Sequence, residues 1–152
     1  MRDGDGWTEC SFGHRHWGRY GAAGVMAVTL GEPYVLLQHR APWSHGGDTW
    51  GVPGGARDST ESALEAAQRE TVEETGLDVT RLTTVGTHVA DHGSWTYTTI
   101  VATLPERLPV VAERESVALR WVPAAEVERL PLLPAFAAAL PSLWALLPAR
   151  SS

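Results

Sequence analysis

The pattern of apolar and polar positions along the chain predicts its secondary structure. Several short runs are rich in β-branched and aromatic residues, a composition typical of strands. These runs are 21–30, 34–40, 49–55, 79–90, 95–104 and 117–123. Residues 61–75 are mostly strong helix formers, and Gly76 follows them as a stop signal, so we expect a helix there. Strands on both sides of a helix predict an α/β fold, an α/β/α sandwich around a mixed β-sheet.

The ends of the chain add further segments to this pattern. Residues 123–130 predict a short helix, and residues 133–147 predict a terminal helix that Pro141 interrupts or kinks. Residues 1–19 are polar and rich in glycine and histidine, so we expect an irregular N-terminal arm. Residues 20–150 are expected to form a single domain.

The start of the central helix has several candidate caps. Asp58 and Glu61 have the spacing of a capping box, and Ser59 or Thr60 could equally cap the first turn. Glu65 lies on a different face of this helix from the glutamates near its end, and we expect it to be solvated surface.

The composition limits the class of protein. With 152 residues and an apolar fraction of 43%, the chain can bury one hydrophobic core. No apolar run approaches the roughly 20 residues of a membrane span, so we expect no membrane partner. The net charge of −6 argues against a nucleic-acid polymer as partner. Cys10 is the single cysteine and no apolar leader precedes it, so we expect a cytoplasmic protein.

Three glutamates gather near the end of the central helix. Glu70, Glu73 and Glu74 have the spacing of residues that share one helix face. The helix dipole is negative at this end and disfavours carboxylates there. A divalent cation would reverse that effect, because Mg²⁺ and Mn²⁺ prefer hard oxygen ligands. A solvated charged surface is the alternative, since exposed like-charge pairs cost only about a few tenths of a kcal/mol.

The glutamates belong to a longer pattern that begins at Gly55 and ends at Leu77. Its fixed residues are Gly55, Glu61, Arg69, Glu70, Glu73, Glu74 and Gly76. This pattern resembles the Nudix box, the signature of the Nudix hydrolase superfamily, with one departure at Thr71, where the family usually has an aliphatic residue. The flanking stretches "TWGVPGG" and "LRWVPAAEV" also resemble the family, in the manner of small, MutT-like actinobacterial members. The resemblance implies the Nudix fold.

The resemblance also implies an activity, which is hydrolysis of a pyrophosphate bond in a nucleoside diphosphate linked to another group X. The expected partner is then a small-molecule nucleotide, and the expected cofactor is Mg²⁺ or Mn²⁺. The implied metal ligands are Glu70, Glu73, Glu74 and the carbonyl of Gly54. Arg69 would orient the glutamates through an ion pair, with Glu61 as its candidate partner. Dimers are common in the family, so a homodimer is one option.

A general base outside the box is implied as well. Alignment through Trp121 places Glu115 nearest to the glutamate that many family members use, and Glu113 second. His88 and His92 could serve instead as base or phosphate donor, because imidazole titrates near neutral pH. The choice between them stays open at this point.

The substrate is less sharply defined. Trp95 and Tyr97 could stack on a nucleobase, and Arg15, Arg19 and His92 could face the anionic substrate. The markers of the ADP-ribose, NADH and coenzyme A subfamilies are absent, which by elimination favours a (d)NTP or an oxidised (d)NTP. An ADP-ribose or nucleotide-sugar pyrophosphatase and a non-catalytic nucleotide sensor are the alternatives. The box retains every acidic position, which favours the enzyme.

A second candidate metal site lies near the start of the chain. Cys10, His14 and His16 offer soft-metal ligands in a Cys-x₃-His-x-His pattern, but they are only three and no standard second pair accompanies them. The alternative is that this segment packs Trp17 on the domain.

Overall fold

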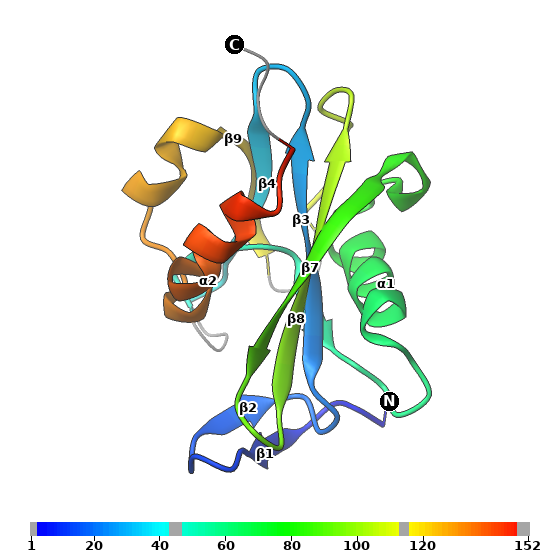
Figure 1. Ribbon diagram of the computed structural model, residues 1–152, viewed down its shortest axis with the longest axis vertical. Helices are drawn as coiled ribbons and strands as arrows, with labels where there is room; N and C mark the ends of the chain where they lie inside the picture. The colour runs from blue at the N-terminus through cyan, green and yellow to red at the C-terminus, as the bar shows by residue number, and fades with distance from the viewer. Residues whose placement is uncertain (1–2, 43–46, 113–115, 149–152) are drawn as a thin grey trace.

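The computed structural model describes residues 3–42, 47–112 and 116–148, and it contains a mixed sheet between two helices (Figure 1). The sheet strands are β3 (Ala22–Thr29), β4 (Tyr34–Arg40), β5 (Trp50–Gly51), β6 (Gly54–Ala56), β7 (Thr83–Asp91), β8 (Thr96–Leu104) and β9 (Ser116–Pro123). Their order is β5-β4-β3-β8-β7, with β6 paired to β3 and β9 paired to β4. β3 and β8 run parallel, whereas the other pairs are antiparallel, so the predicted mixed sheet is confirmed.

The helices α1 (Ala63–Thr75) and α2 (Pro134–Ala145) lie on opposite faces of the sheet, which confirms the predicted α/β/α sandwich (Figure 1). β3 is buried along its whole length, because it is central and covered on both sides. Its alternate residues point to opposite faces and so enter different cores. Val25 belongs to the core under α1, and Met26 belongs to the core under α2.

The two cores differ in the size of their side chains. Under α2 the helix contributes Phe136, Leu140 and Leu143, and burial of such side chains stabilises the fold by roughly 1.5–3 kcal/mol each. Under α1 the helix contributes Ala66 and Ala67, which are both fully buried. These small side chains allow α1 to lie close to β3, and this contact positions the end of the helix.

The start of α1 differs from the prediction. The Ser62 hydroxyl accepts a hydrogen bond from the Glu65 N–H at 3.1 Å, and the Glu65 carboxylate accepts one from the Ser62 N–H at 2.9 Å. This capping box replaces the predicted one, because Asp58 and Glu61 have other partners. Glu65 is exposed, as expected, although it also serves as part of the cap.

The N-terminal arm is not irregular, as had been expected. β1 (Trp7–Glu9) and β2 (Arg15–Trp17) form an antiparallel hairpin at the lower end of the molecule in Figure 1. Trp17 packs edge-on against Trp7, with ring centroids 5.4 Å apart, and stays 43% exposed. It therefore packs within the hairpin and not on the domain. Strands this short carry too few residues to show a period in the sequence.

Three boundaries also differ from the sequence pattern. A 3₁₀ helix, η1 (Val79–Arg81), precedes β7, so that strand begins at Thr83. The short helix after β9 is also 3₁₀, η2 (Ala124–Arg129). α2 continues through Pro141 and does not end there. Among the described residues, we find no helix with the length and apolar character to cross a bilayer.

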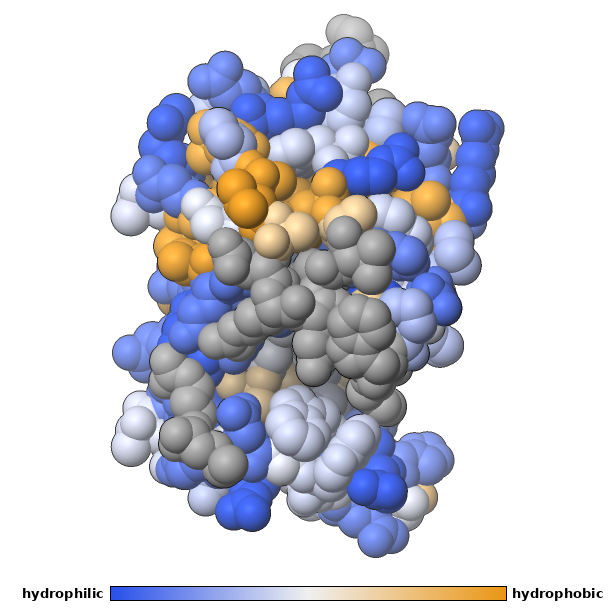
Figure 2. All heavy atoms as spheres, turned by 180° about the vertical axis from the view of Figure 1, so that it is seen from behind, coloured by the Kyte–Doolittle hydropathy of each residue, from blue (hydrophilic) through white to orange (hydrophobic). Residues whose placement is uncertain are grey.

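Figure 2 shows the molecule from behind. Apolar residues gather across the upper part of this face, and hydrophilic residues dominate its lower part. The end of the molecule that carries the β1–β2 hairpin is therefore mainly polar on this side.

Candidate functional site

The three glutamates lie on the last turns of α1 and face the chain segment that contains β6. Glu70 is buried, and Glu73 and Glu74 are half-buried. The Glu74 Oε2 atom accepts a hydrogen bond from the N–H of Gly54 at 3.1 Å. Gly76 ends the helix directly after them in the left-handed conformation, with a φ of 68°, as predicted. These contacts hold the glutamates in place, which a solvated charge cluster would not require.

Arg69 connects the glutamates to one another. Its Nε and Nη2 atoms donate to the two carboxylate oxygens of Glu61 at 2.7 and 2.8 Å, which is the ion pair expected from the sequence. Its Nη1 atom donates to Glu70 at 2.7 Å and to Glu73 at 3.2 Å, and Nη2 also donates to the carbonyl of Ala56. The hydrogen bonds to Glu61 and Glu70 raise the pKa of Arg69 above its usual value, against the effect of partial burial. Arg69 is therefore fixed as a cation.

The two glycines before the helix allow a very close approach. A Cβ at Gly55 would lie 2.5 Å from the carboxyl carbon of Glu70. A Cβ at Gly54 would lie 2.5 Å from the carbonyl oxygen of Ala23 and 2.7 Å from the hydroxyl of Tyr97. These distances are shorter than real Cβ contacts. Only glycine fits at these positions while the glutamate face and the sheet stay as they are.

Tyr97 and Trp95, the two aromatic candidates, have different surroundings. The Tyr97 hydroxyl lies beside the backbone of Gly54, and burial together with the charge of Glu74 raises its pKa above the usual value. Trp95 is 7% exposed, and its ring stacks on His16 with centroids 4.0 Å apart. Tyr97 is therefore next to the glutamate face, whereas Trp95 has little surface to offer a nucleobase.

Thr71, the one departure from the box, is accommodated within α1. Its side chain is buried, and its hydroxyl donates to the carbonyl of Ala67 at 2.7 Å. The polar atom is thus satisfied by the helix backbone while the methyl group reaches the core. The substitution leaves the glutamate face unchanged.

The arginines expected to face the substrate have their described contacts in the N-terminal segment. The Arg15 guanidinium lies 4.6 Å above the ring of Trp7. The Arg19 side chain passes beside Gly6, where a Cβ would lie 2.8 Å from its Nε atom. These contacts do not bring either arginine to the glutamates. Their role in substrate binding stays a prediction.

The candidate bases are also placed apart from one another. His88 is half-buried on β7, opposite Thr99 of β8. His92 lies in the turn between β7 and β8 and joins Cys10 and two other histidines, away from the role predicted for it. Glu113 and Glu115 lie outside the described residues.

Sequence reasoning missed one residue that supports the site. Asp58 accepts a hydrogen bond from the Gly4 N–H at 3.2 Å, and its other oxygen lies 3.8 Å from Nη2 of Arg69. It therefore links the N-terminal segment to the arginine that holds the glutamates. The sequence had suggested Asp58 only as a helix cap, and no local signal indicates its contact with Gly4.

The donors on this face fit a hard divalent cation. Carboxylates of Glu70, Glu73 and Glu74 offer oxygen ligands, and the glycine backbone approaches them without side chains in between. Oxygen donors of this kind are typical of Mg²⁺ and Mn²⁺ sites. Arg69 offsets part of the negative charge and orients two of the carboxylates. The arrangement can therefore bind a cation and, through it, an anionic substrate.

Comparison with known proteins places this site in a family. The family model for the NUDIX domain matches residues 19–143. The chain is 52% identical over 145 residues to the Mycobacterium tuberculosis protein named "Putative 8-oxo-dGTP diphosphatase 3", covering 90% of this chain and 67% of that protein. It is 40% identical over 155 residues to a nucleoside triphosphate pyrophosphatase/Nudix hydrolase fusion protein of Bifidobacterium longum, covering 92% of this chain and 32% of that protein.

A solved structure agrees with these sequence matches. The crystal structure of RenU, a Nudix hydrolase from M. smegmatis, matches with a TM-score of 0.87 and 45% identity. The match covers 98% of this chain and 100% of that one. The fold, the box on α1 and these relatives agree, and the chain belongs to the Nudix hydrolase superfamily, as a pyrophosphohydrolase.

Proposed function

We propose that this protein hydrolyses a pyrophosphate bond of a (d)NTP or an oxidised (d)NTP, with Mg²⁺ or Mn²⁺ as cofactor. The observation that carries the proposal is the braced glutamate face, in which Glu70, Glu73 and Glu74 lie beside the double glycine. Arg69 holds two of these carboxylates at hydrogen-bonding distance. A protein of net charge −6 needs such a site to accept a polyphosphate.

The residues of the face would divide the work as follows. Glu70, Glu74 and Glu73 would hold the cation, together with the carbonyl of Gly54. When bound, the cation offsets phosphate charge and lowers the pKa of a coordinated water. Arg69 keeps the carboxylates oriented, since it bonds to two of them. In the reaction, water forms a bond to one phosphorus, the P–O bond to the leaving phosphate breaks, and a base takes the proton of the water.

The base is proposed to be Glu115, from its place in the family alignment. His88 is the alternative, on β7 of the same sheet. A Glu115→Gln variant should lower kcat by about 10²–10⁴-fold while leaving the KM for substrate nearly unchanged. An unchanged kcat would exclude Glu115, and His88→Gln would then be measured in the same way.

The substrate class rests on the relatives and on the missing markers of other subfamilies. The M. tuberculosis relative is named for 8-oxo-dGTP, an oxidised dNTP, and the B. longum relative is named in part as a Nudix hydrolase. A small nucleotide is therefore the proposed partner. The cytoplasmic location and the homodimer stay predictions, and size-exclusion chromatography with light scattering would test the second.

A substrate panel tests the proposal. The panel contains dNTPs, 8-oxo-dGTP, ADP-ribose, dinucleoside polyphosphates and nucleotide sugars, each with Mg²⁺ or Mn²⁺, and chromatography identifies the products. We expect turnover of 8-oxo-dGTP or a dNTP, and a loss of at least about a hundredfold in Glu74→Gln. Glu65→Gln is the matched control, because it alters an exposed glutamate of the same helix and retains the capping-box geometry.

The other outcomes lead elsewhere. Turnover confined to ADP-ribose or nucleotide sugars would replace the proposed substrate class. Nucleotide binding without any turnover, in a chain that remains folded, would indicate the non-catalytic sensor.

A further inference from the structure

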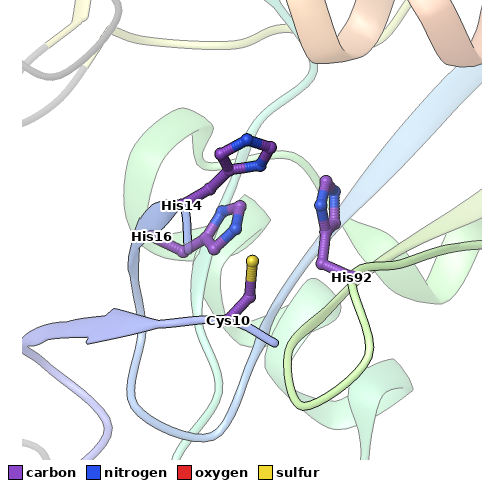
Figure 3. A group of neighbouring side chains, drawn as sticks. All are labelled: Cys10, His14, His16 and His92. Atoms are coloured by element: carbon purple, nitrogen blue, oxygen red, sulfur yellow. The ribbon is translucent and has the colours of Figure 1, made fainter. Parts of the chain in front are cut away.

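Four side chains with metal-ligating atoms converge at the end of the sheet that carries the hairpin (Figure 3). Cys10, His14, His16 and His92 each offer one ligand atom, and these atoms all lie within 4.8 Å of one another. The first three come from the β1–β2 hairpin, and His92 comes from the turn between β7 and β8. The sequence showed only three ligands, and the fold supplies the fourth from a segment far along the chain.

The hairpin presents its ligands on one side. Alternate residues of a strand point in opposite directions, so the two faces of the hairpin carry different residues. One face carries the ring contacts of Trp7 with Trp17 and with Arg15. His14 and His16 lie on the other face, toward the β7–β8 turn (Figure 3). The tryptophans and the histidines are therefore separated by the hairpin itself.

Backbone hydrogen bonds hold the hairpin turn in place. The Cys10 N–H donates to the His14 carbonyl at 2.8 Å, and the Gly13 N–H donates to the Cys10 carbonyl at 3.0 Å. The two turns are also joined directly, since the Ser94 N–H donates to the Ser11 hydroxyl at 3.0 Å. The position of the hairpin against the β7–β8 turn therefore does not depend on a metal ion.

The β7–β8 turn and its neighbour Trp95 orient the imidazoles. The His92 N–H donates to the Trp95 carbonyl at 2.8 Å, and the Gly93 N–H donates to Asp91 at 2.7 Å. The Trp95 ring lies almost parallel to His16, with an angle of 9° between the planes. The side chains of two ligands are thus set by contacts outside the cluster, as in a preorganised site.

We propose that Cys10, His14, His16 and His92 form a structural Zn²⁺ site that joins the N-terminal hairpin to the β7–β8 turn. Thiolate and imidazole are the ligands that zinc prefers, and four protein ligands complete a tetrahedron. In a tetrahedral Zn²⁺ site the Zn–S and Zn–N bond lengths place donor atoms roughly 3.4–3.6 Å apart. The side chains need to close by only about 1 Å from their present spacing.

The site is closed on one side and open on the other. Cys10 is buried, His16 and His92 are half-buried, and His14 is exposed. An ion can therefore enter from the His14 side, while the thiolate stays away from solvent. The ligands are chemically distinct from the carboxylates of α1, which suit Mg²⁺ and Mn²⁺. The zinc site is thus independent of the proposed function.

Metal analysis of the whole chain tests the proposal. The protein is purified without chelators under a phosphine reductant, supplied with Zn²⁺ and desalted, and its metal content is measured by elemental analysis. We expect about one zinc ion per chain, which a strong chelator removes slowly. Replacement with Co²⁺ should give the visible bands of a tetrahedral ion and a thiolate-to-cobalt charge-transfer band. Because Cys10 is the single cysteine, that band identifies Cys10 as a ligand.

Variants separate this site from other metal-binding positions. Cys10→Ser should abolish the charge-transfer band, and His92→Ala should weaken Zn²⁺ binding by at least about tenfold. His88→Ala is the matched control, a half-buried histidine of β7 outside the cluster, and it should retain the zinc. Glu74→Gln should also retain it, which distinguishes the cluster from the glutamate face.

Hydrogen exchange supplies a readout that does not depend on variants. With Zn²⁺ bound, the amides of residues 7–17 should exchange more slowly, since the ion fixes the hairpin to the turn. Less than about a tenth of an equivalent of zinc in the wild-type chain would overturn the proposal. A cobalt spectrum without a charge-transfer band, or a metal content lost in Glu74→Gln and kept in Cys10→Ser, would overturn it too.

Discussion

Replacement of Gly55 by alanine is a direct test of the link between backbone geometry and activity. Gly55 lies in β6, in an extended backbone conformation that alanine can adopt without strain. An alanine Cβ would lie 2.5 Å from the carboxyl carbon of Glu70 and 2.6 Å from its Oε2 atom. The change therefore acts on Glu70 through steric contact and leaves the charge of the site unaltered.

The expected magnitude follows from these distances. Carbon atoms in contact are normally about 3.5–4.0 Å apart, so the Glu70 carboxylate must move by roughly 1 Å. A displacement of this size in a catalytic group lowers the rate by about 10²-fold, which corresponds to about 2.7 kcal/mol. The crowding itself should lower the free energy of unfolding by about 1–3 kcal/mol.

The assay compares kcat, the Mg²⁺ concentration for half-maximal activity, and urea unfolding for Gly55→Ala and the wild type. Gly31→Ala is the control, since Gly31 has a φ of 71° and a Cβ added there would meet no described atom within 4 Å. That variant carries backbone strain without crowding any glutamate, so it should lose stability and keep its activity. Wild-type kcat and Mg²⁺ dependence in a folded Gly55→Ala would refute the assignment of Glu70 as a metal ligand held by close packing.

Three further predictions concern the contacts around α1. Arg69→Lys cannot keep the paired hydrogen bonds to Glu61, so the Mg²⁺ needed for half-maximal activity should rise by about 10–100-fold in a titration. Ser62→Ala removes the helix cap and should lower the free energy of unfolding by about 1 kcal/mol in urea, with kcat unchanged. Hydrogen bonds from the side chain and backbone of Ser59 lower the pKa of Asp3 below its usual 3.8, so this contact stabilises the fold above that pH and is lost as the pH falls through the lowered pKa. The amide exchange of Ser59 measured against pH should show this loss, and Asp3→Ala should remove the pH dependence.

The catalytic helix could be predicted from sequence because its signals are local. The spacing of Glu70, Glu73 and Glu74 fixes a shared face, and Gly76 marks the end of the helix. The mixed sheet and its covering helices followed from runs of apolar residues with suitable lengths. The pairing of Arg69 with Glu61 also spans only a few turns of chain, and the structure confirms it.

The features that were missed depend on contacts between distant segments. The sequence around His92 gives no sign of Cys10, which lies on a different strand pair. Ser62 was overlooked as the cap because several neighbouring residues had capping side chains, and only the contacts of Asp58 and Glu61 exclude those two. The hairpin was missed because strands of three residues carry no measurable period.

The parallel pairing of β3 with β8 has a consequence for how the chain is made. Ala22 pairs with Tyr97 and Thr29 pairs with Leu104, so each residue waits for a partner that is synthesised about 75 positions later. At about 5–20 residues per second, the ribosome needs roughly 4–15 s to cover that interval. During this time a strand that the native fold buries on both faces lacks its central neighbour. We expect the nascent chain to depend on chaperones in this window, and the refolding rate of the isolated protein to be limited by closure of this long loop.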